Sequence, residues 1–174
     1  MAIAKELGLD QQQIDDILQT EWNIRVATVG PGERINLTPM WFGWAGGKIY
    51  IHGRGQKIIN LRKNPTCTML VDRNEKFPEL QGIMMLGKAH VLEDATAEQA
   101  DPHLAEVRVQ MGKKYNGGHG KPPVENPPPV ATTAGGSTRR WFVFTPETIV
   151  TWDNFKLSRL SANRSIRRSS ETRA

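Results

Sequence analysis

The sequence predicts a mostly β, antiparallel barrel of six or seven strands, decorated by small helices. Short β-prone runs recur along the chain, and glycine- and proline-rich turns separate them. The regular alternation of strand and helix that builds parallel sheets is missing. A length of 174 residues favours one domain, which we place at residues 1–159, followed by a tail over residues 160–174.

The N-terminal third combines one helix with three predicted strands. Asp10 and Gln13 have the spacing of a capping box, which predicts an amphipathic helix over residues 10–19. The β-prone runs span residues 22–29, 34–44 and 48–52. Turns at Gly30-Pro-Gly-Glu33 and Ala45-Gly-Gly47 separate these runs, so we expect an antiparallel meander of three strands.

The middle of the chain alternates short helices with strands. A helix of one or two turns is expected within residues 53–63, because Asn64-Pro65 stops it. Strands follow at residues 66–72 and 82–92, the second bent by a kink or bulge at Gly87. Residues 94–114 are expected to be helical, with Asp101-Pro102 as N-cap and first-turn proline and residues 94–100 as a separable turn.

The last third contains a long loop and two further predicted strands. Residues 116–138 hold five prolines and five glycines, a composition that opposes both helix and central strand. Strands are expected at residues 140–145 and 148–152, separated by Pro146-Glu147.

Charge and hydropathy exclude several classes of protein. The formal net charge is +5, but residues 160–174 carry four arginines against one glutamate and thus +3 of it, leaving about +2 for the body. This weakens a nucleic-acid-binding interpretation, and the Ser- and Arg-rich tail is expected to be disordered. No segment approaches the roughly 20 apolar residues of a membrane helix, and no signal-peptide core is visible, so we expect a cytoplasmic protein.

The familiar catalytic and metal motifs are scarce. A single cysteine, Cys67, excludes an intrachain disulfide framework and multi-cysteine metal sites, and its apolar strand predicts a small buried side chain. The four histidines do not have the spacing of a metal site, and we expect no metal. No nucleophile elbow, His-Glu-x-x-His motif or Walker loop is present.

Residues 37–60 contain the most informative pattern. A strand end is followed by a second strand, and then glycines and basic residues open a short helix. Helix-opening N–H groups together with Arg and Lys form a phosphate site, and the adjacent strands offer a surface for a flat ring. The alternative is a hairpin followed by a surface helix whose basic residues merely face water.

Six ordered segments carry a resemblance to a known family. They are Val26-Ala-Thr-Val-Gly-Pro-Gly, Leu37-Thr-Pro-Met-Trp-Phe, Lys48-Ile-Tyr-Ile, Gln56-Lys-Ile-Ile-Asn-Leu-Arg-Lys-Asn-Pro65, Cys67-Thr-Met-Leu-Val-Asp72 and Gly87-Lys-Ala-His-Val91. In order and spacing they resemble the pyridoxamine 5′-phosphate oxidase-like split β-barrel family, whose fold is the FMN-binding split barrel. More narrowly, the chain resembles its flavin/deazaflavin oxidoreductases that use coenzyme F420. The resemblance covers roughly residues 10–156 and includes Trp152-Asp-Asn-Phe-Lys156.

The resemblance implies a homodimer that holds its cofactor in grooves between subunits. The ring would lie against the strands at 35–42 and 48–54, and Arg54-Gly-Gln-Lys57 would hold the phosphate. Many members have Ser, Thr or Arg before this lysine, whereas this chain has Gly55 and Gln56, which shifts the grip toward Arg54 and backbone amides. The cofactor-binding residues implied are Thr38, Pro39, Trp41, His52, Arg54, Gln56, Lys57 and Asn60.

The resemblance also implies an oxidoreductase that transfers hydride between F420 and an unsaturated or conjugated small molecule, with no protein nucleophile. The alternatives are an FMN-dependent oxidase or reductase of the same fold, and a noncatalytic F420 or flavin carrier. Trp41 and Trp152 either line the ring or substrate cavity or pack in the core. The loop at 116–138 either covers the groove or is a passive solvent loop.

Overall fold

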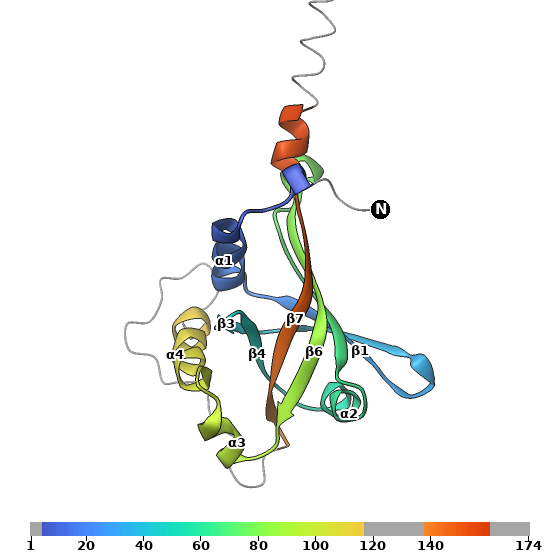
Figure 1. The fold of residues 1–174 in the computed structure, drawn as a ribbon, viewed down its shortest axis with the longest axis vertical. Coiled ribbons are helices and arrows are strands. Elements are labelled where there is room, and N and C mark those ends of the chain that lie inside the picture. Colours follow the sequence, from blue (N-terminus) through green and yellow to red (C-terminus); the bar gives the residue numbers. More distant parts are fainter. Residues whose placement is uncertain (1–4, 117–137, 161–174) are drawn as a thin grey trace, which may run out of the picture.

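The computed structural model describes residues 5–116 and 138–160, and within them seven strands form one sheet. The interior of the loop at 116–138 and nearly all of the tail at 160–174 lie outside the described residues. The strands are β1 Ile24–Val29, β2 Ile35–Met40, β3 Gly43–Ala45, β4 Lys48–Gly53, β5 Thr66–Arg73, β6 Gln81–Leu92 and β7 Arg140–Asp153. The helices are α1 Gln11–Thr20, α2 Gln56–Lys63, α3 Ala95–Ala100 and α4 Leu104–Tyr115, with single 3₁₀ turns at Lys5–Leu7, Pro31–Glu33 and Phe77–Glu79. Residues 154–160, directly after β7, are also helical (Figure 1).

The sheet is fully antiparallel and curled. Its strand order is β2-β1-β5-β6-β7-β4-β3, so β2 and β3 lie at opposite edges although they follow each other in the chain (Figure 1). Only Trp41 and Phe42 connect them, and three Cα–Cα steps span at most about 11 Å. The two edges must therefore approach each other, which gives the split barrel that the sequence predicted.

The expected meander of three strands is wrong. The run over residues 34–44 divides into β2 and β3, which pair with β1 and β4 respectively and never with each other. The reason lies at Phe42, whose backbone N–H donates to the Tyr115 hydroxyl and whose carbonyl accepts from it, both at 3.0 Å. A side chain from α4 thus takes the backbone hydrogen bonds that strand pairing would have used.

One long strand, β7, replaces the two strands predicted around Pro146-Glu147. The proline stands opposite Gly87, where the register between β6 and β7 shifts by a bulge. At a bulge the ladder does not require the N–H that proline lacks, so the strand continues. The predicted bulge at Gly87 is confirmed, and a Cβ there would lie 2.2 Å from the Thr145 carbonyl oxygen.

The helix starts follow local sequence signals. The capping box of Asp10 and Gln13 is confirmed at α1. The predicted helix at 94–114 divides into α3 and α4, and Asp101 is not the N-cap of α4, which is His103. The Asp101 carboxylate instead accepts from the backbone N–H groups of His103 at 3.0 Å and Leu104 at 2.9 Å, which stabilises the turn before the helix.

Two apolar clusters pack on the two faces of the sheet. The larger one fills the barrel interior, where α1 and α2 contribute Ile17 and Ile58 and β5 contributes Cys67, which is buried as predicted. The smaller one lies between the sheet and α4 and includes Tyr50 and Trp141. None of the helices in the described parts of the chain is long and apolar enough to cross a membrane.

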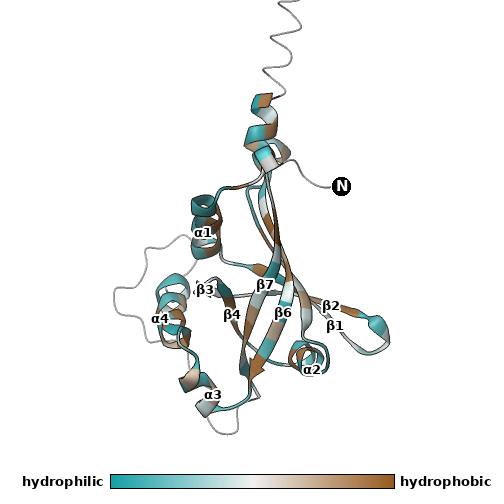
Figure 2. Cartoon of the chain, viewed as in Figure 1, coloured by the Kyte–Doolittle hydropathy of each residue, from teal (hydrophilic) through white to brown (hydrophobic). Residues whose placement is uncertain are grey.

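A third apolar surface has no cover within the described chain. Ile35 and Leu37 on β2 are each 63% exposed, and Figure 2 shows brown segments along the β1–β2 arm that extends from the body. The strand register places further apolar residues on this outer face, namely Ala27, Leu70, Met84, Leu86 and Val150. We call this the outer sheet face.

Candidate functional site

Helix α2 begins with backbone N–H groups and basic side chains pointing to one region. Gly55 is the N-cap with φ of 81°, a left-handed conformation that favours glycine. Its carbonyl accepts from Ile58 and Ile59, so the N–H groups of Gln56 and Lys57 have no partner within the helix. No acidic residue lies in the first turn, and a phosphate is favoured at such an end.

The Lys57 side chain crosses close to the backbone of β4. Its Nζ donates to the carbonyl oxygen of Arg54 at 3.1 Å. A Cβ on Gly53 would lie 3.5 Å from Lys57 Cδ and 3.2 Å from Met40 Cε, so the lysine stem and β2 both approach this glycine. Burial of the Lys57 ammonium lowers its pKa. An anionic ligand beside this ammonium would offset the cost of removing it from water.

Asn60 connects the helix to the sheet. Its amide Nδ2 donates to Thr28 Oγ1 on β1 at 3.0 Å, and its Oδ1 accepts from Gln56 Nε2 at 2.8 Å. Gly30 permits this position, because a Cβ there would lie 3.3 Å from the Asn60 amide atoms. Asn60 is buried and already has two partners, so it orients Gln56 rather than facing a ligand.

The inward side of β2 presents two polar atoms without partners. Asn36 Oδ1 and Thr38 Oγ1 are buried and make no hydrogen bond to any residue that the structure describes. Asn36 and Thr38 pair with Thr28 and Val26, both buried, which fixes the orientation of β2 toward the interior. A cavity of about 300 Å³ lies beside Asn36, lined by Gly30, Pro31, Arg34, Ile35, Asn36, Gln56 and Asn60. Thr38 follows Asn36 on the same face of β2, and Lys57 follows Gln56 in α2. We call the cavity together with Thr38 and Lys57 the β2–α2 groove.

The structure brings only part of the predicted site together. Thr38, Gln56, Lys57 and Asn60 lie around the β2–α2 groove, and Arg54 precedes it with an exposed side chain. The groove also includes Asn36 and Arg34, which the sequence reasoning missed. The signal for Asn36 was its position two residues before Thr38, which places both on one face of a strand.

Three predicted residues lie elsewhere. Pro39 is exposed and pairs with Arg25, so it belongs to the outer side of β2. Trp41 is 52% exposed and stacks on the ring of Tyr115, with centroids 4.5 Å apart. His52 points to the α4 face of the sheet, where its ring stacks on Trp141 at 4.9 Å.

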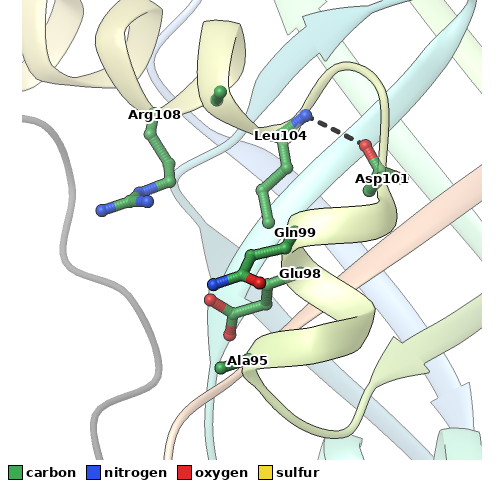
Figure 3. Close-up of a pocket in the computed structure, with 7 residues that line it drawn as sticks. Ala95, Glu98, Gln99, Asp101, Leu104 and Arg108 are labelled. Atoms are coloured by element: carbon green, nitrogen blue, oxygen red, sulfur yellow. Dashed lines mark hydrogen bonds between the residues drawn. The ribbon is translucent and has the colours of Figure 1, made fainter.

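A separate pocket lies between α3 and α4, and the charges of Glu98 and Arg108 in its lining act on His52. Figure 3 shows Glu98 and Gln99 of α3 and Arg108 of α4 along this cavity of about 400 Å³, with Asp101 accepting from the Leu104 N–H. Burial, followed by the charge of Arg139, lowers the pKa of His52. The sheet therefore separates the imidazole of His52 from the β2–α2 groove.

Trp152 does not pack in the barrel core either. Its indole covers Gly82, where a Cβ would lie 1.9 Å from the ring, and it lines an apolar pocket of about 370 Å³ with Leu7, Phe77 and Leu80. Within residues 5–116 and 138–160, no three His, Cys, Asp or Glu side chains come close enough to hold a metal ion.

Comparison with solved structures supports the fold. The conserved hypothetical protein Rv2991 from Mycobacterium tuberculosis aligns over 91% of this chain and 93% of its own, with 22% identity and a TM-score of 0.70. An FAD-binding protein from Mesorhizobium loti aligns over 82% and 94%, with 15% identity and a TM-score of 0.59. An F420 reductase aligns over 78% and 94%, with 20% identity and a TM-score of 0.51.

These identities establish a shared architecture and leave the branch within it open. No curated protein matches the sequence significantly. The family model for pyridoxamine 5′-phosphate oxidase matches residues 10–153, which is most of the chain and all seven strands. The chain therefore belongs to the pyridoxamine 5′-phosphate oxidase family.

Proposed function

We propose that the protein is an F420-dependent oxidoreductase that holds the cofactor phosphate in the β2–α2 groove. The observation that carries this proposal is the pair of buried, unpartnered atoms Asn36 Oδ1 and Thr38 Oγ1, which lie on β2 beside the basic first turn of α2. A buried polar atom without a partner costs about 1–3 kcal/mol, and a polar ligand that bonds to it offsets this cost.

The residues of the groove fit a phosphorylated ligand. Lys57 supplies a positive charge, and the N–H groups of Gln56 and Lys57 point out of the helix end. The Thr38 hydroxyl can donate to an acceptor oxygen, while the Asn36 amide can offer both a donor and an acceptor. Gly53 and Gly55, on either side of Arg54, carry no side chain, so that a ligand can approach the backbone at these two positions.

A bound deazaflavin supplies a hydride for transfer to a conjugated small molecule. The protein's part in such a reaction is to orient the ring and acceptor and to exclude water, which requires no nucleophilic side chain. Cys67 is unsuited to that role in any case, because burial raises the pKa of its thiol to about 12.

The groove would be completed by a second copy of the chain, as in a homodimer. The outer sheet face supports this, because Ile35 and Leu37 are exposed on β2, the same strand whose other side lines the groove. Soluble monomers rarely leave large apolar patches open. Light scattering is expected to give twice the mass of the chain, with Leu37→Asp shifting the protein to a monomer. A monomeric wild-type protein would contradict this assembly.

Titration of the purified protein with F420 and with FMN, followed by quenching of cofactor fluorescence, tests the proposal. We expect saturable binding of F420, and oxidation of reduced F420 by a member of a panel of quinones, enones and linear tetrapyrroles. If the protein purifies yellow and binds FMN but not F420, its cofactor is FMN and the F420 assignment is wrong. Tight binding of F420 without turnover on any acceptor would indicate a carrier.

A further inference from the structure

A buried lysine outside the β2–α2 groove lies among aromatic rings. Lys114, at the end of α4, places its Nζ 4.0 Å from the ring centroid of Phe42 and 5.3 Å from that of Tyr115. Trp41 stacks flat on Tyr115, and Trp22 contacts both rings edge-on at 6.3 and 5.3 Å. We call Trp22, Trp41, Phe42 and Tyr115 the aromatic cluster.

The Lys114 amine has no hydrogen-bond partner among the described residues. Its Nζ is buried, and no acceptor in residues 5–116 or 138–160 lies within hydrogen-bond distance. Glu21 is the charged group that acts on it, but the Glu21 carboxylate accepts from Arg73 Nε at 2.6 Å. The tyrosine hydroxyl of the cluster is also occupied, because Tyr115 bonds to the backbone of Phe42. The face of an aromatic ring attracts an ammonium, but this attraction replaces only part of the stabilisation that water would give.

This environment favours the neutral form of the amine. Burial lowers the pKa of Lys114 to about 7, and the negative charge of Glu21 opposes this shift only in part. A neutral lysine amine has a free electron pair, and desolvation in an apolar pocket is one of the ways in which proteins activate lysine as a nucleophile.

The cluster reaches the surface of the molecule through Trp41. The indole of Trp41 is 52% exposed, while Tyr115 and Phe42 beneath it are buried. A flat, conjugated molecule can stack on or replace this ring, because offset stacking is the favoured contact between aromatic systems. The amine and a stacking surface for the same ligand therefore lie within one cluster.

We propose that Lys114 forms an imine with a conjugated aldehyde or ketone that stacks against the aromatic cluster. The nitrogen electron pair attacks the carbonyl carbon and forms the C–N bond. The nitrogen releases its two protons to the carbonyl oxygen, the C–O bond breaks and the oxygen leaves as water, so that no electrons are gained or lost. Imine formation at Lys114 needs no bound cofactor, so its test is independent of the function proposed for the groove.

Reductive trapping on the full-length protein tests the imine. The protein is incubated at neutral pH with benzaldehyde and sodium cyanoborohydride, which reduces an imine to a stable benzylamine, and the modified lysine is located by peptide mass spectrometry. The adjacent, exposed Lys113 is the internal control. We expect Lys114 to be labelled roughly tenfold or more faster than Lys113, because a far larger fraction of its amine is neutral.

Three variants separate reactivity from folding. Lys113→Arg should retain the fast labelling, and Lys114→Arg should abolish it while circular dichroism shows an unchanged fold. Trp41→Leu should remove the preference for benzaldehyde over acetaldehyde, because it removes the exposed stacking ring. Equal labelling of Lys113 and Lys114, or no labelling of Lys114 in the folded wild-type protein, would overturn the proposal.

Discussion

The two ends of strand β2 lie in different chemical environments. At its beginning, Asn36 and Thr38 face inward and Asn36 lines a cavity with Gln56 of α2, and at its end the chain passes into Trp41 and Phe42 beneath α4. Both ends leave buried polar atoms without partners, on Asn36 and Thr38 in the groove and on Lys114 in the aromatic cluster. The two ends differ in whether the unpartnered group can lower the cost of its burial by changing its protonation state.

The two unpartnered groups of the groove are neutral and cannot change their protonation state. The hydroxyl of Thr38 and the amide of Asn36 remain unsatisfied at every pH until a ligand supplies partners. The lysine amine can instead release its proton and become less costly to bury. The groove is therefore suited to a polar anion, whereas the cluster is suited to a neutral, flat molecule.

The largest effect is expected in the groove, at its positive charge. Lys57→Ala should weaken binding of F420, or of FMN if that is the cofactor, at least tenfold, because a charge-assisted hydrogen bond to phosphate contributes roughly 1.5–3 kcal/mol. The midpoint of urea unfolding should hardly change. Fluorescence titration of the cofactor measures the first quantity and circular dichroism the second.

Lys63→Ala is the matched control for this substitution. Lys63 lies in the last turn of the same helix, is exposed and has the same charge. Its removal should leave cofactor affinity within about twofold, because net charge alone contributes little at physiological ionic strength. Equal losses of cofactor affinity in both variants would indicate that the groove acts only as a basic surface and that the phosphate binds elsewhere.

A smaller effect, of opposite sign, is expected at the other end of β2. Between the folded pKa of about 7 and the ordinary value of 10.5, the unfolded chain holds more protons on Lys114 than the folded one. Stability therefore rises with pH across this window. Lys114→Met should raise the melting temperature by about 2–4 °C at pH 6, with a gain that declines from pH 7 toward 10.5.

The exposed neighbour again provides the comparison. Lys113→Met should change the melting temperature by less than about 1 °C, because exposed substitutions rarely exceed about 0.5 kcal/mol. Melting curves of the three proteins from pH 6 to 10.5 decide the matter. A gain for Lys114→Met that stays constant with pH would mean that the amine keeps its ordinary pKa.

Local signals predicted most of the fold. The capping box at Asp10, the helix stop at Asn64-Pro65, the two-glycine turn before Lys48 and the bulge at Gly87 all act over a few residues, so the sequence displays them directly. The errors arose where partners lie far apart. The Tyr115 hydroxyl, 73 positions from Phe42, bonds to the backbone where the predicted strand over residues 34–44 divides into β2 and β3.

The same distinction explains the site. Gln56, Lys57 and Asn60 were predicted together because they share one helix, and Thr38 because a motif contained it. His52 was grouped with them by proximity in sequence, but strand alternation turns its ring to the opposite face of the sheet. The contact of Lys114 with Phe42 joins residues 72 positions apart, and no spacing rule indicates it.

The smallest expected effect distinguishes an unsatisfied hydroxyl from a satisfied one. Thr28 and Thr38 both face inward on neighbouring strands, but only Thr28 accepts a hydrogen bond, from Asn60 Nδ2. Thr38→Val should stabilise the ligand-free protein by about 0.5 kcal/mol and weaken cofactor binding roughly threefold to tenfold. Thr28→Val should destabilise it by about 1–2 kcal/mol, because the buried Asn60 amide loses its acceptor. Urea unfolding with and without cofactor measures both effects. If Thr38→Val also destabilised the ligand-free protein, its hydroxyl would already have a partner, and the groove would lose its strongest support.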